Sequence, residues 1–283
     1  MAETSVGLER ACVYVVATPI GNLEDLSPRA VRVLREVAVI ACEDTRHTAI
    51  LCRHFGIETP RVSLHAHNEA RRVPELLARL ERGESLALVS DAGTPLVSDP
   101  GERLVRAALE AGFAVVPVPG ASAVLAALVA SGFAPRPFAF AGFLPRRGAE
   151  RARELEALAR FPGALVLFEA PNRAAATLAD LRAALGPRRV ALARELTKRH
   201  ETVLRGVLGE LELHELRGEL AIVVEGPPPG AGEPEASADE IDAQIARLLA
   251  AGRTARDTAR EIAARFGLAR RDAYARVLGR RGG

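Results

Sequence analysis

The residues from Leu88 to Gly101 form the stretch with the clearest potential for binding chemistry. They read Leu-Val-Ser-Asp-Ala-Gly-Thr-Pro-Leu-Val-Ser-Asp-Pro-Gly and end a short apolar run that predicts a buried strand. Apolar residues at helical spacing follow from Leu104, so the order is strand, loop, helix. Loops leaving the carboxyl ends of strands line the ligand crevice of an open α/β sheet, and Gly93 lets a ligand approach the backbone. The same composition is also typical of a turn-rich connection without a ligand.

Two further loops have the same character. Pro19-Ile20-Gly21-Asn22 follows a predicted strand at 11–17, and Pro119-Gly120-Ala121-Ser122 follows one at 114–118. If the three loops converge at one sheet edge, they form a crevice of backbone amides and hydroxyls with little charge, which suits a nucleoside cofactor. The chain has no Walker loop and no Gly-x-Gly-x-x-Gly after a strand, which disfavours phosphate-driven chemistry and the usual dinucleotide site.

The elements that position these loops alternate between short apolar strands and helices, which predicts a mostly parallel sheet. Ser27-Pro28, for example, predicts a capped helix running to about Glu36. After Pro135-Arg136-Pro137 the rhythm restarts and predicts a second, mixed sheet. We therefore predict an α/β fold with an N-terminal domain at 1–134, a second α/β domain at 135–226, a Pro/Gly-rich linker at 227–238 and a basic helical tail at 239–283.

Composition sets the broad class. Of the 283 residues 48% are hydrophobic and 26% charged, which fits a soluble globular protein, and the net charge of +2 does not decide its partner. Cys12, Cys42 and Cys52 have neither disulfide nor metal-ligand spacing, which fits a reducing cytosol. Residues 1–10 lack the basic start of a signal peptide, and prolines and glycines interrupt the uncharged run at 111–135. We expect a cytoplasmic protein without a membrane span.

The tail is the most basic part of the chain. From Ala246 to the end it holds ten arginines against Asp257, Glu261 and Asp272. Thr254 as a cap, Gly267 in a turn and Arg270-Arg271 at the start of the last helix resemble a helix-turn-helix. Basic helices after a linker favour phosphate backbones, although a solvated arginine face is the alternative in an arginine-rich chain.

Taken in order, the loops resemble the tetrapyrrole-methylase superfamily of S-adenosylmethionine-dependent methyltransferases over about residues 12–226. One branch is especially similar, the small-subunit ribosomal RNA methyltransferase I family, which methylates the ribose 2′-oxygen of a decoding-centre cytidine in 16S rRNA. The motifs that carry the likeness are Thr-Pro-Ile-Gly-Asn-Leu-Glu-Asp at 18–25, Ala-Cys-Glu-Asp-Thr-Arg at 41–46, the stretch 90–101 and Glu-Leu-Thr-Lys at 195–198. The first of these replaces the more usual glycine-rich loop of the superfamily. The basic tail is similar to that branch as well.

The resemblance implies a two-domain tetrapyrrole-methylase-like fold, S-adenosylmethionine in the cleft between the domains, a homodimer, and 16S rRNA as partner within the small ribosomal subunit. By motif position it implies that the cofactor is bound by Ile20, Gly21, Asp91, Ala92, Gly93, Thr94, Val97, Ser122, Ala123, Glu169 and Thr197. The sulfonium is already activated, so the protein mainly has to position it.

A ribose hydroxyl needs a base or a cation before it attacks. The only lysine, Lys198, is the first candidate, either as a base with a lowered pKa or as a charged group beside the developing alkoxide. Glu43, Asp44 and Glu195 are rival bases. Each also has a structural interpretation, since the first two could cap the next helix and Glu195 could pair with a neighbouring arginine.

Asn172 and Arg173 stand at a strand-to-helix turn, where they could hold RNA phosphate or cap the helix; with Arg270 and Arg271 they complete the predicted RNA contacts. His65-x-His67 lacks an evident third ligand, so we predict no metal site. Two other functions remain open from sequence. One is a tetrapyrrole methyltransferase, against which the basic tail argues. The other is a non-catalytic RNA-binding module, against which the three loops argue.

Overall fold

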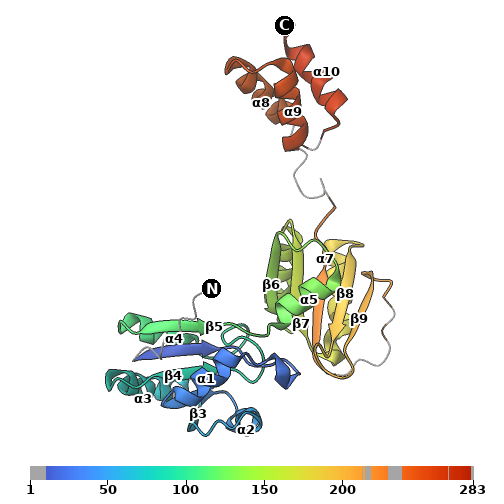
Figure 1. The fold of residues 1–283 in the computed structure, drawn as a ribbon. Coiled ribbons are helices and arrows are strands. Elements are labelled where there is room, and N and C mark those ends of the chain that lie inside the picture. The colour runs from blue at the N-terminus through green and yellow to red at the C-terminus, as the bar shows by residue number, and fades with distance from the viewer. Residues whose placement is uncertain (1–10, 212, 214–217, 229–237, 267, 282–283) are drawn as a thin grey trace.

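The computed structural model describes residues 11–211, 213, 218–228, 238–266 and 268–281. The first of its two sheets contains β1 (Cys12–Val16), β2 (Val39–Cys42), β3 (Arg61–Ser63), β4 (Leu86–Val89) and β5 (Ala114–Val118). These strands lie in the order β3-β2-β4-β1-β5 and all pair in parallel (Figure 1). The predicted parallel sheet is confirmed, and four of its strands are almost wholly apolar because helices cover both faces.

Two helices pack on each face of the first sheet. Helices α1 (Pro28–Glu36) and α2 (Thr45–His54) pack on one face, and α3 (Glu69–Glu81) and α4 (Glu102–Glu110) pack on the other. The 3-10 turn η1 (Leu23–Asp25) precedes α1. The Ser27 hydroxyl accepts the Ala30 N–H at 3.1 Å, which confirms the predicted cap of α1.

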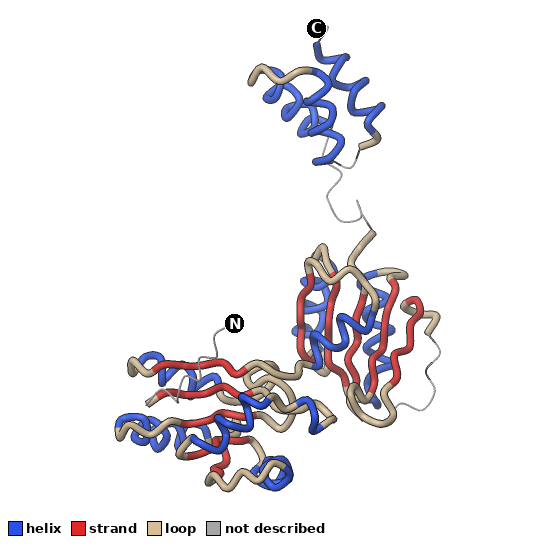
Figure 2. The backbone as a smooth tube through the Cα atoms, in the orientation of Figure 1, coloured by secondary structure: helices blue, strands red, loops and turns tan. Residues whose placement is uncertain are grey.

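The second sheet contains β6 (Phe138–Phe143), β7 (Ala164–Glu169), β8 (Arg189–Arg194), β9 (Thr202–Val207) and β10 (Leu220–Val224) in the order β6-β7-β10-β8-β9. Only the β6–β7 pair is parallel, so this sheet is mixed, as predicted. Helix α5 (Ala123–Ser131) covers one face; α6 (Gly148–Ala159) and α7 (Ala174–Leu185), the latter preceded by the turn η2 (Pro171–Arg173), cover the other (Figure 2).

Helix α5 connects the two halves in a way that the sequence did not indicate. The predicted boundary at residue 134 assigns α5 to the N-terminal domain, yet its Val124, Ala127 and Leu128 pack against β7, β8 and β10 of the second sheet. The reason is that α5 is apolar around most of its circumference and carries no charged residue. Such a helix needs a sheet face to cover, and the second sheet has a free one.

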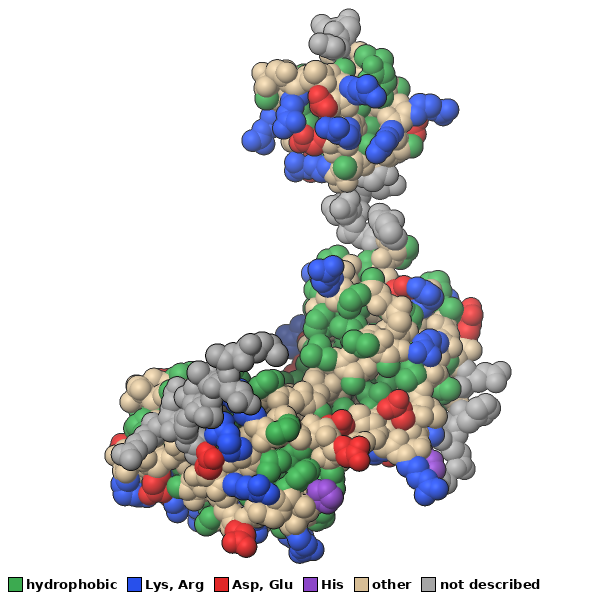
Figure 3. Space-filling view, viewed as in Figure 1, with side chains coloured by type: hydrophobic (Ala, Val, Ile, Leu, Met, Phe, Trp, Pro, Cys, Tyr) green, Lys and Arg blue, Asp and Glu red, His purple; other side chains and the backbone are tan. Residues whose placement is uncertain are grey.

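The tail folds around a core of its own. Helices α8 (Ala238–Ala250), α9 (Ala255–Phe266) and α10 (Arg270–Arg281) bury Ile245, Ile262 and Val277 between them. The Asp257 N–H donates to the Thr254 hydroxyl at 3.1 Å, so Thr254 caps α9 as predicted. Figure 3 shows several arginine side chains on the face of this unit that is in view. Most of the predicted linker, and Gly267, lie outside the described residues.

None of the helices in the described ranges combines the length and the continuous apolar character that spanning a bilayer requires.

Candidate active site

The strand order places the three predicted loops side by side. Strands β4, β1 and β5 are neighbours and parallel, so the loops that follow them leave the same edge of the sheet. Thr18 and Gly93 form an antiparallel bridge, with N–H to carbonyl distances of 2.8 and 3.1 Å. The Thr94 hydroxyl donates to the Ala121 carbonyl at 3.4 Å. The loops are therefore joined by hydrogen bonds as well as by proximity.

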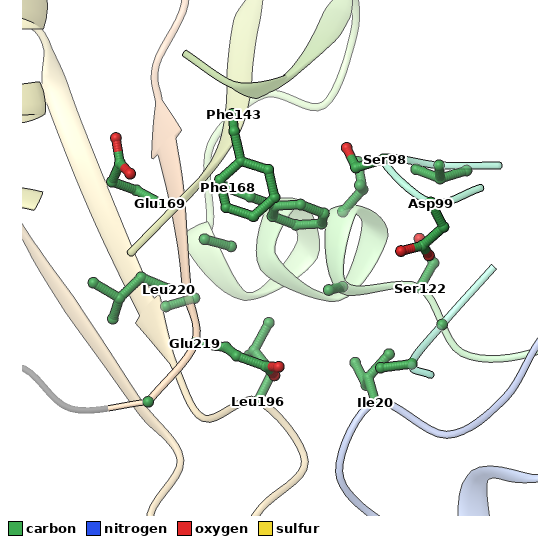
Figure 4. A pocket seen from close by; sticks show the side chains of 18 of the residues that line it. Ile20, Ser98, Asp99, Ser122, Phe143, Phe168, Glu169, Leu196, Glu219 and Leu220 are labelled. Carbon is green, nitrogen blue, oxygen red and sulfur yellow. The ribbon is translucent and has the colours of Figure 1, made fainter. Parts of the chain in front are cut away.

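A cavity of about 450 Å³ lies between these loops and the second sheet (Figure 4). Most of the residues predicted to bind the cofactor line it, namely Ile20, Asp91, Ala92, Gly93, Thr94, Val97, Ser122, Ala123 and Glu169. The lining also includes residues that the sequence did not single out, among them Ser98, Asp99, Phe143, Phe168, Leu196, Glu219 and Leu220.

Gly21 and Thr197 do not line the cavity but lie at the contact between its two walls. A Cβ atom on Gly21 would stand 2.4 Å from Lys198 Cγ and 2.9 Å from Thr197 Oγ1. The first loop therefore approaches the β8–β9 loop so closely that only glycine fits. The Thr197 hydroxyl is buried there and has no hydrogen-bond partner among the described residues.

Several residues with strained backbone angles lie in the loop after β4 and in the β8–β9 loop. Leu96 and Ser98, on the β4 side, have φ angles of 74° and 71°, and Glu195 and Thr197, on the opposite side, have φ angles of 52° and 66°. Residues other than glycine rarely adopt positive φ angles. Where they do, they cluster at functional sites, and the surrounding structure holds them in place.

Glu169 is held firmly in the cavity wall. It is almost fully buried, and its carboxylate accepts the Thr177 hydroxyl at 2.6 Å and the Ala170 N–H at 2.8 Å. Arg173 Nε lies 3.3 Å from the same carboxylate. The Thr177 hydroxyl in turn accepts from the buried Arg151 at 3.0 Å. This network fixes the end of β7, where Glu169 ends the strand.

Lys198 is ion-paired rather than isolated. Its Nζ lies 3.1 Å from Glu195 Oε1 and 3.2 Å from Glu219 Oε2. Although partial burial acts to lower the pKa of the Lys198 ammonium, these two carboxylates outweigh it and raise that pKa above its usual range. The prediction of a lysine base with a lowered pKa is therefore wrong, because the neighbours that would set its pKa are anionic and not cationic. These contacts do not contradict the other predicted role of Lys198, that of a charged group beside the developing alkoxide.

The rival carboxylates have distinct environments. Glu195 accepts the Glu219 N–H at 3.0 Å. That bond, the contact with Lys198 and the charge of Arg194 lower the Glu195 pKa. Asp44 accepts the Arg46 N–H at 2.8 Å and pairs with its guanidinium, which lowers the Asp44 pKa. Asp44 thus has the predicted helix-capping role. Burial, with the charge of Asp91, raises the pKa of Glu43.

The predicted RNA contacts lie in two places. Asn172 is exposed in η2, whereas the Arg173 guanidinium is directed inward and donates to the Leu144 carbonyl at 2.8 Å besides pairing with Glu169. Arg173 forms no capping bond and is committed to the cavity wall, which leaves it poorly placed to hold a phosphate. Arg270 and Arg271 are exposed at the start of α10.

The cavity has a marked charge preference. All of the charged residues that line it are acidic, namely Asp91, Asp99, Glu169 and Glu219. The remaining lining is apolar or small, with Phe143 and Phe168 packed at a ring-centroid distance of 5.7 Å. An apolar cleft with a few carboxylates suits a flat ligand that carries positive charge. In the described ranges no three His, Cys, Asp or Glu residues form a group that could hold a metal ion.

Sequence comparison now gives the class of protein to which this fold and cleft belong. The profile of the family described as Tetrapyrrole (Corrin/Porphyrin) Methylases matches residues 12–212. Solved structures agree in fold. A diphthine synthase superimposes with a TM-score of 0.62 at 17% identity and covers 76% of this chain and 90% of its own. The Thermus thermophilus uroporphyrin-III C-methyltransferase, in complex with S-adenosylhomocysteine, gives 0.53 at 22% identity and covers 75% and 96%.

Closer relatives narrow the class. The ribosomal RNA small subunit methyltransferase I of Synechocystis sp. is 45% identical over 93% of this chain and 95% of its own length. The enzyme of the same name from Pseudomonas aeruginosa is 48% identical over 84% and 85%. The chain therefore belongs to the ribosomal RNA small subunit methyltransferase I family, and the resemblance drawn from its motifs is confirmed.

Proposed function

We propose that the protein transfers the methyl group of S-adenosylmethionine to the ribose 2′-oxygen of a decoding-centre cytidine in 16S rRNA. The observation that carries this proposal is the cleft. Three interlocked small-residue loops and the second sheet enclose a cavity whose charged lining is entirely acidic. The relatives that share up to about half of the sequence are named as methyltransferases of small-subunit ribosomal RNA.

The donor fits the cleft by charge and shape. S-adenosylmethionine has an adenine ring, a positively charged sulfonium, an ammonium and one carboxylate, so it is a cation overall. Phe143, Phe168 and Ile20 offer apolar surface for the adenosine, while the carboxylates of Asp91 and Glu219 favour the positive groups. Transfer releases neutral S-adenosylhomocysteine, which the acidic lining attracts less strongly.

The acceptor is a polyanion, which this acidic cleft would repel. We assign its capture to the tail, where Arg270 and Arg271 are exposed at the start of α10 and Arg260 is exposed on α9. Phosphate contacts of this kind position RNA without reading its sequence. We therefore assign the specificity for one cytidine to the cleft and its rim.

We also propose a homodimer. Leu125 and Val129 on α5 are 53% and 77% exposed, although the other side of the helix is buried on the second sheet. Two copies packed through this apolar face would remove it from water. Replacing Val129 with glutamate is expected to shift the sedimentation of the protein from dimer to monomer; an unchanged dimer would place the interface elsewhere.

The methyl acceptor is tested with labelled S-adenosylmethionine and three substrates: undermethylated small ribosomal subunits, naked 16S rRNA and uroporphyrinogen III. A 2′-O-methyl group blocks alkaline cleavage of the adjacent phosphodiester, so label is expected in an alkali-resistant dinucleotide that contains cytidine. Label in the porphyrinoid would support a tetrapyrrole methyltransferase instead. RNA binding with no label anywhere would support a non-catalytic module.

A further inference from the structure

The turn between β6 and α6 carries two exposed arginines beside the cleft. Residues 144–147 read Leu-Pro-Arg-Arg, and we call them the rim turn. Phe143 directly precedes this turn and lines the cavity, although its side chain is 55% exposed; Figure 4 shows its ring beside that of Phe168. Four residues of extended chain span about 14 Å at most, which keeps the backbone of Arg146 and Arg147 close to the cavity wall.

A β-bulge in β6 gives the rim turn its direction. Between Phe140 and Phe143, β6 has one residue more than its partner strand β7. Gly142 lies in the bulge with a φ of 62°, and a Cβ added to it would stand 3.2 Å from Ser98 Oγ. Bulges bend a strand and redirect the side chains that follow, and they are common beside active sites. The bulge thus brings the end of β6 against the loop after β4, which forms the other wall of the cleft.

Two inward-directed arginines hold the rim turn from behind. Arg173 donates to the Leu144 carbonyl at 2.8 Å, and Arg151 donates to the Pro145 carbonyl at 2.9 Å. Arg151 is only 9% exposed, and its Nε also donates to Asp180 at 2.8 Å. Burying a guanidinium is costly unless acceptors surround it, and here two of those acceptors are consecutive parts of one network behind the turn. The arginines of the rim turn therefore extend from a backbone that is already fixed.

The side chains of Arg146 and Arg147 are available to a ligand. Both are exposed, and neither forms an ion pair or a hydrogen bond within the described part of the chain. Glu150, in the first turn of α6, is the nearest acidic residue in the sequence. Because the charged lining of the cavity is entirely acidic, the rim turn places positive charge beside a negative cleft. Arginine suits a phosphate in such a place, since its planar guanidinium binds two phosphate oxygens at once.

We propose that Arg146 and Arg147 hold phosphates of the acceptor RNA next to the reacting nucleotide. The acidic cleft attracts the cationic donor but repels a polyanion, and cations beside the cleft offset that repulsion. The two arginines are positioning residues, because they fix the RNA backbone and do not touch the reacting atoms. This inference rests on the proposed methylation of 16S rRNA and adds a second RNA contact to that of the tail.

The test replaces both arginines with glutamine, Arg146→Gln together with Arg147→Gln. Single-turnover methyl transfer to undermethylated small subunits is measured with donor and enzyme both saturating. We expect this rate to fall about 10- to 100-fold, because the ribose is no longer held in line with the donor. In a separate binding assay, the slope of log affinity for subunits against log salt is expected to fall by about 1.5. Donor affinity and thermal unfolding are expected to match the wild type.

Two matched variants separate positioning from a general loss of charge. Arg79→Gln with Arg82→Gln removes the same charge at the end of α3, which precedes β4 and therefore lies at the sheet edge opposite the cleft. This pair is expected to match the wild type in rate and in salt slope. Arg146→Lys with Arg147→Lys keeps the charge and is expected to retain the wild-type salt slope, since charge determines that slope.

The assignment would be overturned by a glutamine pair with the wild-type rate and salt slope, or by a rate loss that follows a loss of donor affinity or of folding. A lysine pair that loses the slope as the glutamine pair does would overturn it as well. A wild type that places no label on RNA would instead refute the proposed function, and the salt slope of subunit binding would still decide whether the rim turn contacts RNA.

Discussion

Gly21→Ala is the substitution for which the structure gives the most direct expectation. The new methyl group would lie 2.4 Å from Lys198 Cγ and 2.9 Å from Thr197 Oγ1, whereas ordinary contacts begin at 3.4 Å. Either the first loop or the β8–β9 loop must therefore retreat by about 1 Å, a displacement that can cost up to ~100-fold in rate when it moves groups around a reaction. The neighbouring Ile20 and Leu196 line the cavity from these two loops and would move with them.

We expect Gly21→Ala to weaken S-adenosylmethionine binding about tenfold, which corresponds to ~1.4 kcal/mol, and to lower the methyl-transfer rate more. Overpacking is expected to reduce the free energy of unfolding by about 1–3 kcal/mol. The assays are calorimetric titration with the donor, thermal unfolding and single-turnover transfer. Gly279→Ala is the control, because no atom lies within 4 Å of its added Cβ and α10 would gain helix propensity. A folded Gly21→Ala protein with wild-type donor affinity and rate would refute the claim that the two loops meet tightly at the site.

The remaining predictions concern charge. Lys198→Arg keeps a cation beside Glu195 and is expected to retain most of the methyl-transfer rate in a single-turnover assay; complete loss would restore a lysine base, since arginine cannot act as one. Folding raises the pKa of Asp99 from the ordinary 3.8 to about 6, so the folded state binds this proton more tightly. The resulting stability is present below about pH 4 and lost as pH rises through about 6. Asp99→Asn should therefore stabilise the protein at pH 7.5, by about 1 kcal/mol and not the ~3 kcal/mol of the full shift, because the side chain is only half-buried; denaturant titration that shows destabilisation would contradict this. Replacing Arg270 and Arg271 together with glutamine should weaken binding to small subunits and reduce the slope of log affinity against log salt by about 2, without changing donor affinity; an unchanged slope would place the RNA elsewhere.

The sequence was sufficient for most of the first sheet because its signals are local. Ser27-Pro28 begins α1 through a bond to Ala30, and the loops at 19–22, 91–95 and 119–122 each follow an apolar strand. Their convergence follows from parallel pairing, in which consecutive carboxyl ends share one sheet edge. The family motifs then identified the class of chemistry.

The opposite wall of the cleft could not be predicted in the same way. Phe143, Phe168 and Leu220 line it from β6, β7 and β10. The insertion of β10 between β7 and β8 is a non-local pairing that leaves no local sequence signal. The apolar types of these three residues predict only burial. The packing of α5 on the second sheet is hidden for the same reason, since an apolar helix does not indicate which sheet it covers.

Charge environments were the other unpredictable feature. Lys198 has a raised pKa because both Glu195 and Glu219 pair with it, and Glu219 lies more than twenty residues later in the sequence. Asp99 in a Ser-Asp-Pro-Gly turn has the sequence signature of a turn residue. Of its two acidic neighbours, Asp91 lies eight residues earlier in the same loop and Glu43 follows another strand, β2. In the sequence, acidic residues recur just after several strands. This pattern predicts an acidic sheet edge, but it does not indicate which carboxylate acts as a catalytic base.

The central claim is that the methyl donor occupies the cleft between the three loops and the second sheet. A crystal structure of the protein with S-adenosylhomocysteine tests it most directly. We predict the ligand between Ile20, Gly93 and Ser122 on one side and Phe168 and Leu220 on the other, with its sulfur close to Asp99. Density for the ligand at any other surface, with this cleft left to solvent, would contradict the account.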